Sequence, residues 1–161
     1  DLHRMPKNFY KIVLFFDMAN AFGTAPHSLL KKCISKIADS RVSRYIRDEL
    51  LNRTGFVVEK GEVSSEILLN AVGVPQGGCN SPTLFALLMT DSPILTKNKN
   101  WTSHVFFADD LAVTLARPTL ETARADAIQL VKDVAEWASS RGLVVSFSKT
   151  TLKCFPLVLS H

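Results

Sequence analysis

The sequence predicts an α+β fold, in which an antiparallel or mixed sheet is covered by helices on one face. Two observations lead to this class. Short runs rich in Val, Ile and Phe, which favour strands, alternate with longer segments whose apolar residues recur every three or four positions, as on one face of a helix. These segments follow one another in the order β-α-α-β-β-α-β-β-α-β-β, which is typical of α+β proteins.

Length and composition predict one folded domain. The chain has 161 residues, of which 47% are hydrophobic, so we expect residues 1–161 to form a single domain. The longest apolar runs, residues 12–16 and 84–89, are too short to cross a bilayer, and no membrane partner is expected. The three cysteines form no C-x-x-C pair. This predicts a reducing, intracellular compartment (nucleus or cytoplasm) and no structural zinc.

Positive charge is concentrated in one stretch. The net charge is +4, and residues 31–53 hold seven basic and three acidic residues, so this stretch carries the whole excess. A localised basic surface favours a polyanionic partner. An ordinary solvated pair of helices explains the same pattern, and both interpretations stay open.

The first half of the chain predicts a central strand followed by helices. Residues 9–17 form a strand whose run 12–16 is apolar on both faces, which is typical of a strand inside a sheet. Asp17 ends it. Apolar residues at helical spacing then predict helices over 27–38 and 42–52.

A hairpin and an irregular loop come next. Residues 54–71 are rich in Val with a central Gly61, which predicts a β-hairpin. Residues 73–78 contain a proline and three glycines and therefore cannot form regular structure. Ser81 is the predicted N-cap of a buried helix, with Pro82 at its first position and Pro93 ending or kinking it.

The second half predicts a hairpin, a long helix and a final pair of strands. The hairpin strands are residues 104–107 and 111–115, and the helix runs from 119 to 141, closed by Gly142. Residues 143–147 and 152–159 are the predicted last strands.

Two adjacent carboxylates, Asp109 and Asp110, lie at the tip of this hairpin. Neighbouring like charges oppose each other's ionisation, but divalent cations such as Mg²⁺ reverse that cost by binding carboxylate oxygens. Asp17, at the end of another strand, is the candidate third carboxylate. Two-metal sites use such ligands for in-line displacement at phosphorus. Taken alone, the pair also fits a solvated turn, and Asp17 also fits a helix N-cap.

Four short blocks carry a family resemblance when they are read in order. They are Phe-Asp-Met-Ala-Asn-Ala-Phe at 16–22, followed by Pro26-His27 and Leu29-Leu30; Gly-Val-Pro-Gln-Gly-Gly at 73–78, continued by Ser-Pro-Thr-Leu-Phe; Phe-Ala-Asp-Asp at 107–110; and Gly142-Leu143 with Ser-Lys-Thr at 148–150. Across residues 12–155 the chain thereby resembles the palm of a reverse transcriptase, closest to the polymerases of non-LTR retrotransposons.

The resemblance implies a polymerase palm with a ferredoxin-like core and the activity of an RNA-directed DNA polymerase. Such an enzyme adds dNTPs to a primer 3′-hydroxyl on an RNA template by two-metal nucleotidyl transfer. It uses two Mg²⁺ ions, with Mn²⁺ as a possible substitute. The implied ligands are Asp17, Asp109, Asp110 and the backbone carbonyl of Met18, and we expect Asp17 and Asp109 to lie close enough to share a cation. Most of the fingers and the thumb are absent, so we expect the isolated segment to be inactive.

Further residues take roles by the same resemblance. Phe22 aligns with the steric gate that excludes a 2′-hydroxyl, and Pro75, Gln76 and Gly77 with the loop that contacts the incoming nucleotide and template. Lys149 aligns with a lysine near the leaving pyrophosphate. Each has a plainer explanation that stays open: a core phenylalanine, a Pro-Gly turn and a surface lysine.

Two departures from the family pattern leave rival functions open. Gly23 stands where these enzymes usually carry an acidic residue, and Gly78 replaces a common Ser or Thr. The main alternative is a catalytically inactive nucleic-acid-binding remnant of a decayed retrotransposon copy. A palm-type cyclase or an RNA-dependent RNA polymerase is disfavoured by the combination of Phe22 with Pro75, Gln76 and Gly77.

Overall fold

The computed structural model describes residues 4–51, 53–69, 72–90 and 102–155. The chain divides into two compact units, which are described separately: Asp1–Ala21 with Asp91–His161, and Phe22–Thr90. Strands and helices are both present, so the predicted α+β class is confirmed. Within the described ranges, no helix is long and apolar enough to cross a membrane.

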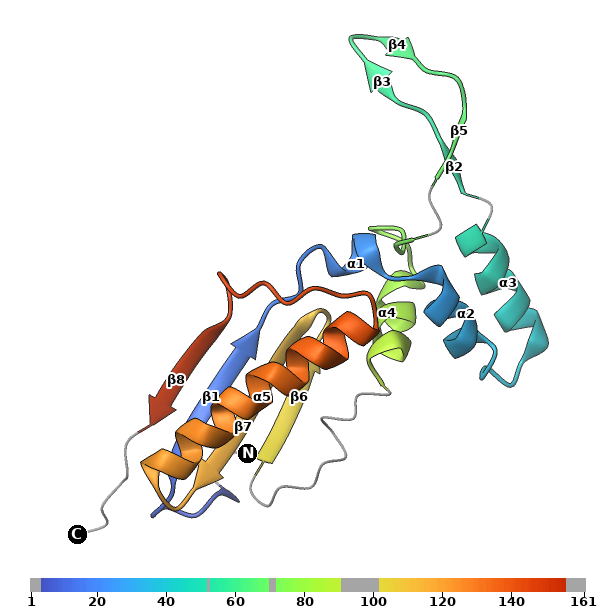
Figure 1. Cartoon of the computed structure of the whole chain (residues 1–161). Helices are drawn as coiled ribbons and strands as arrows, with labels where there is room; N and C mark the ends of the chain where they lie inside the picture. Colours follow the sequence, from blue (N-terminus) through green and yellow to red (C-terminus); the bar gives the residue numbers. More distant parts are fainter. Residues whose placement is uncertain (1–3, 52, 70–71, 91–101, 156–161) are drawn as a thin grey trace. The chain divides into compact units, whose positions relative to one another are not determined.

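The first unit is built on a four-stranded sheet. Its strands are β1 (Tyr10–Phe16), β6 (Thr102–Phe107), β7 (Asp110–Arg117) and β8 (Thr151–Phe155). They lie in the order β6-β7-β1-β8, and every neighbouring pair is antiparallel (Figure 1). Two of the predictions are confirmed: β1 is a central strand, and the order is that of a ferredoxin-like sheet.

Helix α5 (Leu120–Ser140) lies across one face of this sheet and packs against β1 and β7 (Figure 1). Side chains alternate between the two faces of a strand, so the buried set on this face is regular. It consists of Ile12, Leu14, Phe16, Leu111, Val113 and Leu115 from the strands and Ala123, Ala127, Leu130, Val134 and Trp137 from the helix. Only Leu120 of the predicted helix face remains 37% exposed.

The opposite face of the sheet is open only in part: Val13 of β1 and Ala116 of β7 are buried there, whereas the end of the face near Asp17 is exposed. Phe15 is 41% exposed there, so the apolar run of β1 is buried on the face that α5 covers but not at this position of the other face. Val105 and Phe107 of β6 are exposed as well. An apolar residue is not by itself evidence of burial, because burial depends on which elements cover the strand.

Both ends of α5 follow the predicted signals, but the strand predicted after it does not form. The Thr119 side chain accepts a hydrogen bond from the Thr122 amide, and Gly142 has a φ of 67° just past the last turn. Residues 143–147, predicted as a strand, make only an isolated bridge between Val145 and Met18. The segment crosses the residues that follow β1, where no further strand is available to continue a ladder.

In the second unit, helix α2 (His27–Ile34) packs against α3 (Ser40–Leu51) and α4 (Ser81–Met89). α2 is shorter than predicted, and α3 begins earlier because the Asp39 carboxylate accepts the Arg41 and Val42 amides. The predicted N-cap of α4 is wrong. Asn80 occupies that position, and the hydroxyl of Ser81 donates to the Pro75 carbonyl instead. The prediction for Pro93 lies outside the described residues.

The predicted hairpin forms in two short pieces. Strand β2 (Thr54–Gly55) pairs with β5 (Ile67–Leu68), and β3 (Val58–Glu59) pairs with β4 (Glu62–Val63). The turn between β3 and β4 is Lys60-Gly61, and both residues have positive φ, 52° and 87°, as a two-residue type I′ turn requires. The short helix α1 (Ala21–Thr24) begins within the first block of the family pattern, at Ala21.

Candidate active site

Two of the predicted carboxylates meet at the ends of neighbouring strands. Phe16 at the end of β1 is paired with Leu111 of β7, so the next residues, Asp17 and Asp110, stand opposite each other. Residues opposite each other on antiparallel strands place their side chains on the same face of the sheet. Asp17 is two residues from the exposed Phe15, so this is the face that α5 leaves open.

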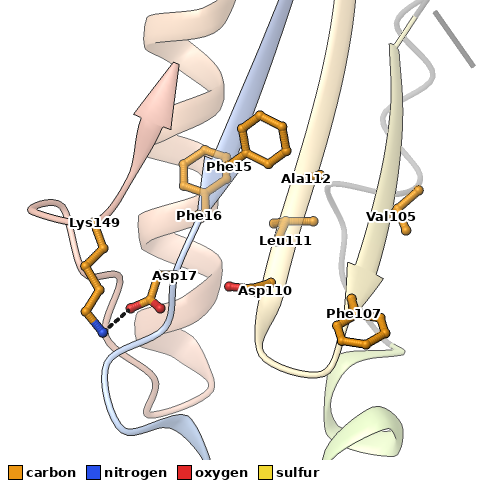
Figure 2. A pocket seen from close by; sticks show the side chains of 9 residues that line it. All are labelled: Phe15, Phe16, Asp17, Val105, Phe107, Asp110, Leu111, Ala112 and Lys149. Atoms are coloured by element: carbon orange, nitrogen blue, oxygen red, sulfur yellow. Dashed lines mark ion pairs between the residues drawn. The ribbon is translucent and has the colours of Figure 1, made fainter. Parts of the chain in front are cut away.

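The two carboxylates open into a cavity of about 350 Å³ on this face. Figure 2 shows Asp110 directed from β7 toward the end of β1, and Asp17 directed toward Lys149. The exposed side chains of Phe15, Val105 and Phe107 line the rest of the cavity with apolar surface. Phe107 is paired with Asp110 and therefore lies beside the acidic groups, while Phe15 lies two residues farther along β1. Such a cavity suits a ligand that has both polar and planar apolar parts.

Lys149 supplies positive charge beside Asp17. Its Nζ lies 3.3 Å from Asp17 Oδ2, and the lysine side chain is 69% exposed (Figure 2). The backbone holds this arrangement, because Ser146 N donates to the Asp17 carbonyl and Lys149 N donates to the Ser146 carbonyl. The segment that fails to form a strand therefore fixes Asp17 and brings the lysine to it.

The Asp17 carboxylate fits a cation. Within the part of the chain that the structure describes, Oδ2 is buried and accepts no hydrogen bond of normal geometry, although the Lys149 ammonium is at ion-pair distance. A buried carboxylate oxygen without a donor is costly unless a positive charge compensates it. Its chemistry, an anionic oxygen beside a second carboxylate, is that of a site for a hard divalent cation.

Asp109 lies in the two-residue loop between β6 and β7. Phe107 and Asp110 form the last pair of the hairpin, and Ala108 takes a φ of 53°. Two-residue hairpins need a positive φ at the first loop position, which costs roughly 1–2 kcal/mol for a residue other than glycine. Asp109 does not line the cavity. The expected pairing of Asp17 with Asp109 stays a prediction, while the strand register places Asp110 beside Asp17.

Across the described residues, no three His, Cys, Asp or Glu side chains come together closely enough to hold one metal ion. The side chain of Met18 is buried, and its backbone is bridged to Val145. The predicted ligand role of the Met18 carbonyl stays a prediction.

The other predicted residues lie in the second unit. Phe22 is half-buried and stacks on Phe85 of α4, with ring centroids 4.7 Å apart and planes 18° apart. The loop that contains Pro75, Gln76 and Gly77 is attached next to it, because Val74 N donates to the Phe22 carbonyl over 2.7 Å. Gln76 and Gly77 are exposed. The structure thus brings the predicted gate residue and the predicted substrate loop together.

The loop 73–78 is held in place by contacts of Gly73 with His27 and Gly23. The His27 ring is buried, and its Nε2 lies 2.7 Å from the Gly73 carbonyl oxygen. A Cβ on Gly73 would lie 2.8 Å from the Gly23 carbonyl oxygen, and the φ of Gly73 is +85°. Gly23, the first departure from the family pattern, therefore lies where the backbone of the loop comes close to its own.

The sequence interpretation did not include Phe15, Val105 and Phe107 as lining of the cavity. A signal was present, because Phe15 precedes Asp17 by two positions, and residues two apart share a face of a strand. Nothing in the local sequence showed that this face would stay uncovered.

The fold and this site define a class of protein. The antiparallel sheet has the order β6-β7-β1-β8, with a helix on one face and carboxylates at the ends of β1 and β7. This is the architecture of a polymerase palm. The chain belongs to the reverse transcriptase (RNA-dependent DNA polymerase) family, whose model matches residues 2–155.

The chain is also similar to a curated transposon protein. The chain is 30% identical over 148 residues to a probable RNA-directed DNA polymerase from transposon X-element of Drosophila melanogaster. The match covers 89% of this chain and 16% of that protein, so the chain spans about a sixth of the relative's length. Reverse transcriptase membership and a transposon-derived relative confirm the predicted family.

Solved structures show the same fold. An apo telomerase of Candida tropicalis, truncated from its C-terminal domain, matches 94% of this chain and 32% of its own, with a TM-score of 0.71 and 15% identity. The telomerase of Candida albicans in complex with a fragment of telomeric RNA matches 89% of this chain and 28% of its own, with a TM-score of 0.67 and 16% identity. At these identities the likeness concerns the fold alone.

Proposed function

We propose that this chain is the palm of a non-LTR retroelement polymerase that adds dNTPs to a DNA primer on an RNA template. The observation that carries the proposal is the meeting of Asp17 and Asp110 on the open face of the sheet, where Asp17 Oδ2 is buried beside a second carboxylate. Residues 1–161 form one palm domain in this proposal, and the remaining fingers and thumb are its partners in a longer polypeptide.

Asp17, Asp109, Asp110 and the Met18 carbonyl would hold two Mg²⁺ ions, with Mn²⁺ as a substitute. When bound, the ions would stabilise charge on the phosphates and lower the pKa of the primer hydroxyl. The sheet supports this role because strand ends hold side chains rigidly, and correct positioning of the reacting groups is a large part of catalysis.

Lys149 acts on the same carboxylate in this proposal. Its ammonium balances the charge of Asp17 at 3.3 Å, and its largely exposed side chain is free to turn toward a phosphate. There it would stabilise the negative charge of the leaving pyrophosphate or donate a proton to it.

Phe22 and the loop residues Pro75, Gln76 and Gly77 would select the nucleotide. The Phe22 ring is held by its stacking on Phe85, and a rigid ring beneath a sugar excludes a 2′-hydroxyl sterically. Gly77 has a φ of +84°, and a Cβ there would meet nothing within 4 Å, so the backbone offers room for a close substrate.

Primer extension on an RNA template, with Mg²⁺ and dNTPs, tests the proposal in a polypeptide that contains this chain. We expect Asp17→Asn and Asp110→Asn each to lower the extension rate by about 10²–10³-fold, because each removes charge that faces the reacting phosphates. Asp133→Asn makes the same chemical change on α5 and should leave the rate unchanged.

The alternative function predicts a different result. A catalytically inactive remnant would bind RNA but extend no primer even with all three carboxylates intact. Full activity of the Asp17→Asn protein would exclude the proposed site.

The cellular location is a further part of the proposal. Cys33, Cys79 and Cys154 are all free thiols, and two of them are exposed. Free exposed thiols persist in a reducing compartment, so we propose an intracellular site of action, in the nucleus or the cytoplasm.

A further inference from the structure

Three arginines form a row along α3. Arg41, Arg44 and Arg47 recur at every third residue of this helix, and all three are exposed. Residues three apart are neighbours on a helix surface. The other side of α3 carries Ile46 and Leu50, which are 8% and 2% exposed, and the helix packs against α2. In the second unit, the arginine row therefore faces away from the core.

Neighbouring carboxylates do not fully neutralise the positive charge of this row. In the described ranges, Arg44 and Arg47 make no ion pair or hydrogen bond. Arg41 pairs with Asp39 at 3.6 Å, but their side chains are 93% and 47% exposed, and such surface pairs contribute little. Asp48 is exposed on the same side of the helix, so the three arginines against Asp39 and Asp48 leave a net charge of +1. Lys31 and Lys32 are exposed on α2, which packs against α3, and add to the positive charge of this unit.

An aromatic ring lies at one edge of the row, beside Arg41. Tyr45 is 61% exposed, and it follows Arg41 by four positions, so the two side chains are neighbours. A helix face that only meets solvent gains nothing from an exposed ring. A ring beside guanidinium groups is the combination on which nucleic-acid bases stack.

We propose that the face of α3 made by Arg41, Arg44, Tyr45 and Arg47 binds single-stranded nucleic acid. The arginines contact phosphates, and the Tyr45 ring stacks on one base. From Arg41 to Arg47 the helix rises roughly 9 Å, so each of the three long side chains can contact a separate phosphate of one strand. A single strand fits best, because its bases are free to stack on a ring.

This inference deepens the proposed function, since it names a surface for the template or primer strand. It does not depend on the metal chemistry of Asp17 and Asp110. Binding can therefore be measured with EDTA and without nucleotides, so its failure and the failure of the polymerase proposal are separate results.

Fluorescence anisotropy of labelled oligouridylate and oligothymidylate, titrated with the full chain over a series of salt concentrations, tests the arginine row. Each phosphate contact of a single strand contributes about 0.7 to the slope of log K against log salt. We therefore expect the triple variant Arg41→Gln, Arg44→Gln, Arg47→Gln to reduce this slope by about 2. A control triple, Lys60→Gln, Arg124→Gln, Lys132→Gln, removes the same charge from other exposed positions and should leave the slope unchanged.

Tyr45 variants test the stacking. Tyr45→Ala should weaken binding about tenfold, while Tyr45→Phe should bind as the unmodified chain does, because the ring is kept. Circular dichroism checks that each variant is folded. Tighter binding of one oligonucleotide over the other would identify an RNA template or a DNA primer as the occupant. Equal slopes for the two triple variants, or equal affinity for a duplex of the same length, would overturn the proposal.

Discussion

At the scale of single residues, Asp17 is the side chain on which the proposed chemistry depends most. One of its oxygens is buried beside Asp110, and Lys149 approaches it to 3.3 Å. A lysine ammonium at that distance occupies the neighbourhood in which a divalent cation would bind. The ammonium and the cation should therefore compete for the same carboxylate.

The Lys149→Gln variant tests this competition. Surface ion pairs contribute about 0.2–1 kcal/mol, so we expect the variant to bind Mn²⁺ roughly two- to fivefold more tightly at low ionic strength. Electron paramagnetic resonance titration of free Mn²⁺ measures the affinity. Lys132→Gln on α5 is the control and should not change it. Weaker Mn²⁺ binding by Lys149→Gln would show that the lysine supports the cation instead of competing with it.

His104 on β6 should make the stability of the first unit depend on pH. Burial lowers the pKa of His104 below its usual value of 6.5. The folded state therefore resists protonation, and the unfolded state takes up the proton more readily. The stabilisation that the neutral ring allows is complete above about pH 6.5, and it is lost as the pH falls through the lower pKa of the folded state.

Urea unfolding at neutral and mildly acidic pH measures this effect. We expect the free energy of unfolding to fall on acidification, and to fall less in His104→Gln, which cannot take up the proton. The other titratable groups are the same in both proteins and cancel in the comparison. An equal fall in the two proteins would assign the acid sensitivity to other groups.

At the scale of elements, close backbone contacts and positive φ angles constrain the loop from Gly73 to Gly78. Gly73 combines a φ of +85° with a Cβ position 2.8 Å from the Gly23 carbonyl, while Gly77 has a φ of +84° and open space around it. Alanine at Gly77 would therefore lose stability only through its backbone conformation, whereas alanine at Gly73 would also clash with the Gly23 carbonyl.

Alanine at these two positions should have unequal effects on stability. Gly77→Ala should destabilise the chain by about 1–2 kcal/mol, the usual cost of the left-handed conformation. Gly73→Ala adds a backbone clash and should cost about 2–4 kcal/mol in total. Urea unfolding followed by circular dichroism gives both values. If the two variants are equally stable, the close approach of Gly73 to Gly23 is not a constraint.

Elements with strong local signals were predicted well. Helix α5 was predicted to within a residue at both ends, because Thr119 and Gly142 mark its termini through contacts with their own neighbours. The segment 143–147 was predicted wrongly as a strand. Its Val and Phe residues favour strands, but a strand also needs a partner along its length, and only Met18 faces Val145 as one.

At the scale of the whole molecule, the order of elements in the sequence predicted the α+β class, and the apolar run 12–16 predicted the central position of β1. Order and periodicity are local properties that the chain carries in any conformation. The sheet order β6-β7-β1-β8 was not predicted from them, because only β6 and β7 pair through a short turn, whereas β1 pairs with β7 and β8, which lie far from it in the chain.

The sequence by itself thus determined most of the strands and helices, the family, and the three acids from which a metal site would be built. Only the tertiary structure decided that Asp110 stands opposite Asp17, that Lys149 reaches the same carboxylate, and that Phe15 lies on an open face. The reason is physical. Helix and strand preferences act between neighbours in the chain, whereas strand register and burial arise from contacts between segments far apart in it, and those exist only once the chain has folded.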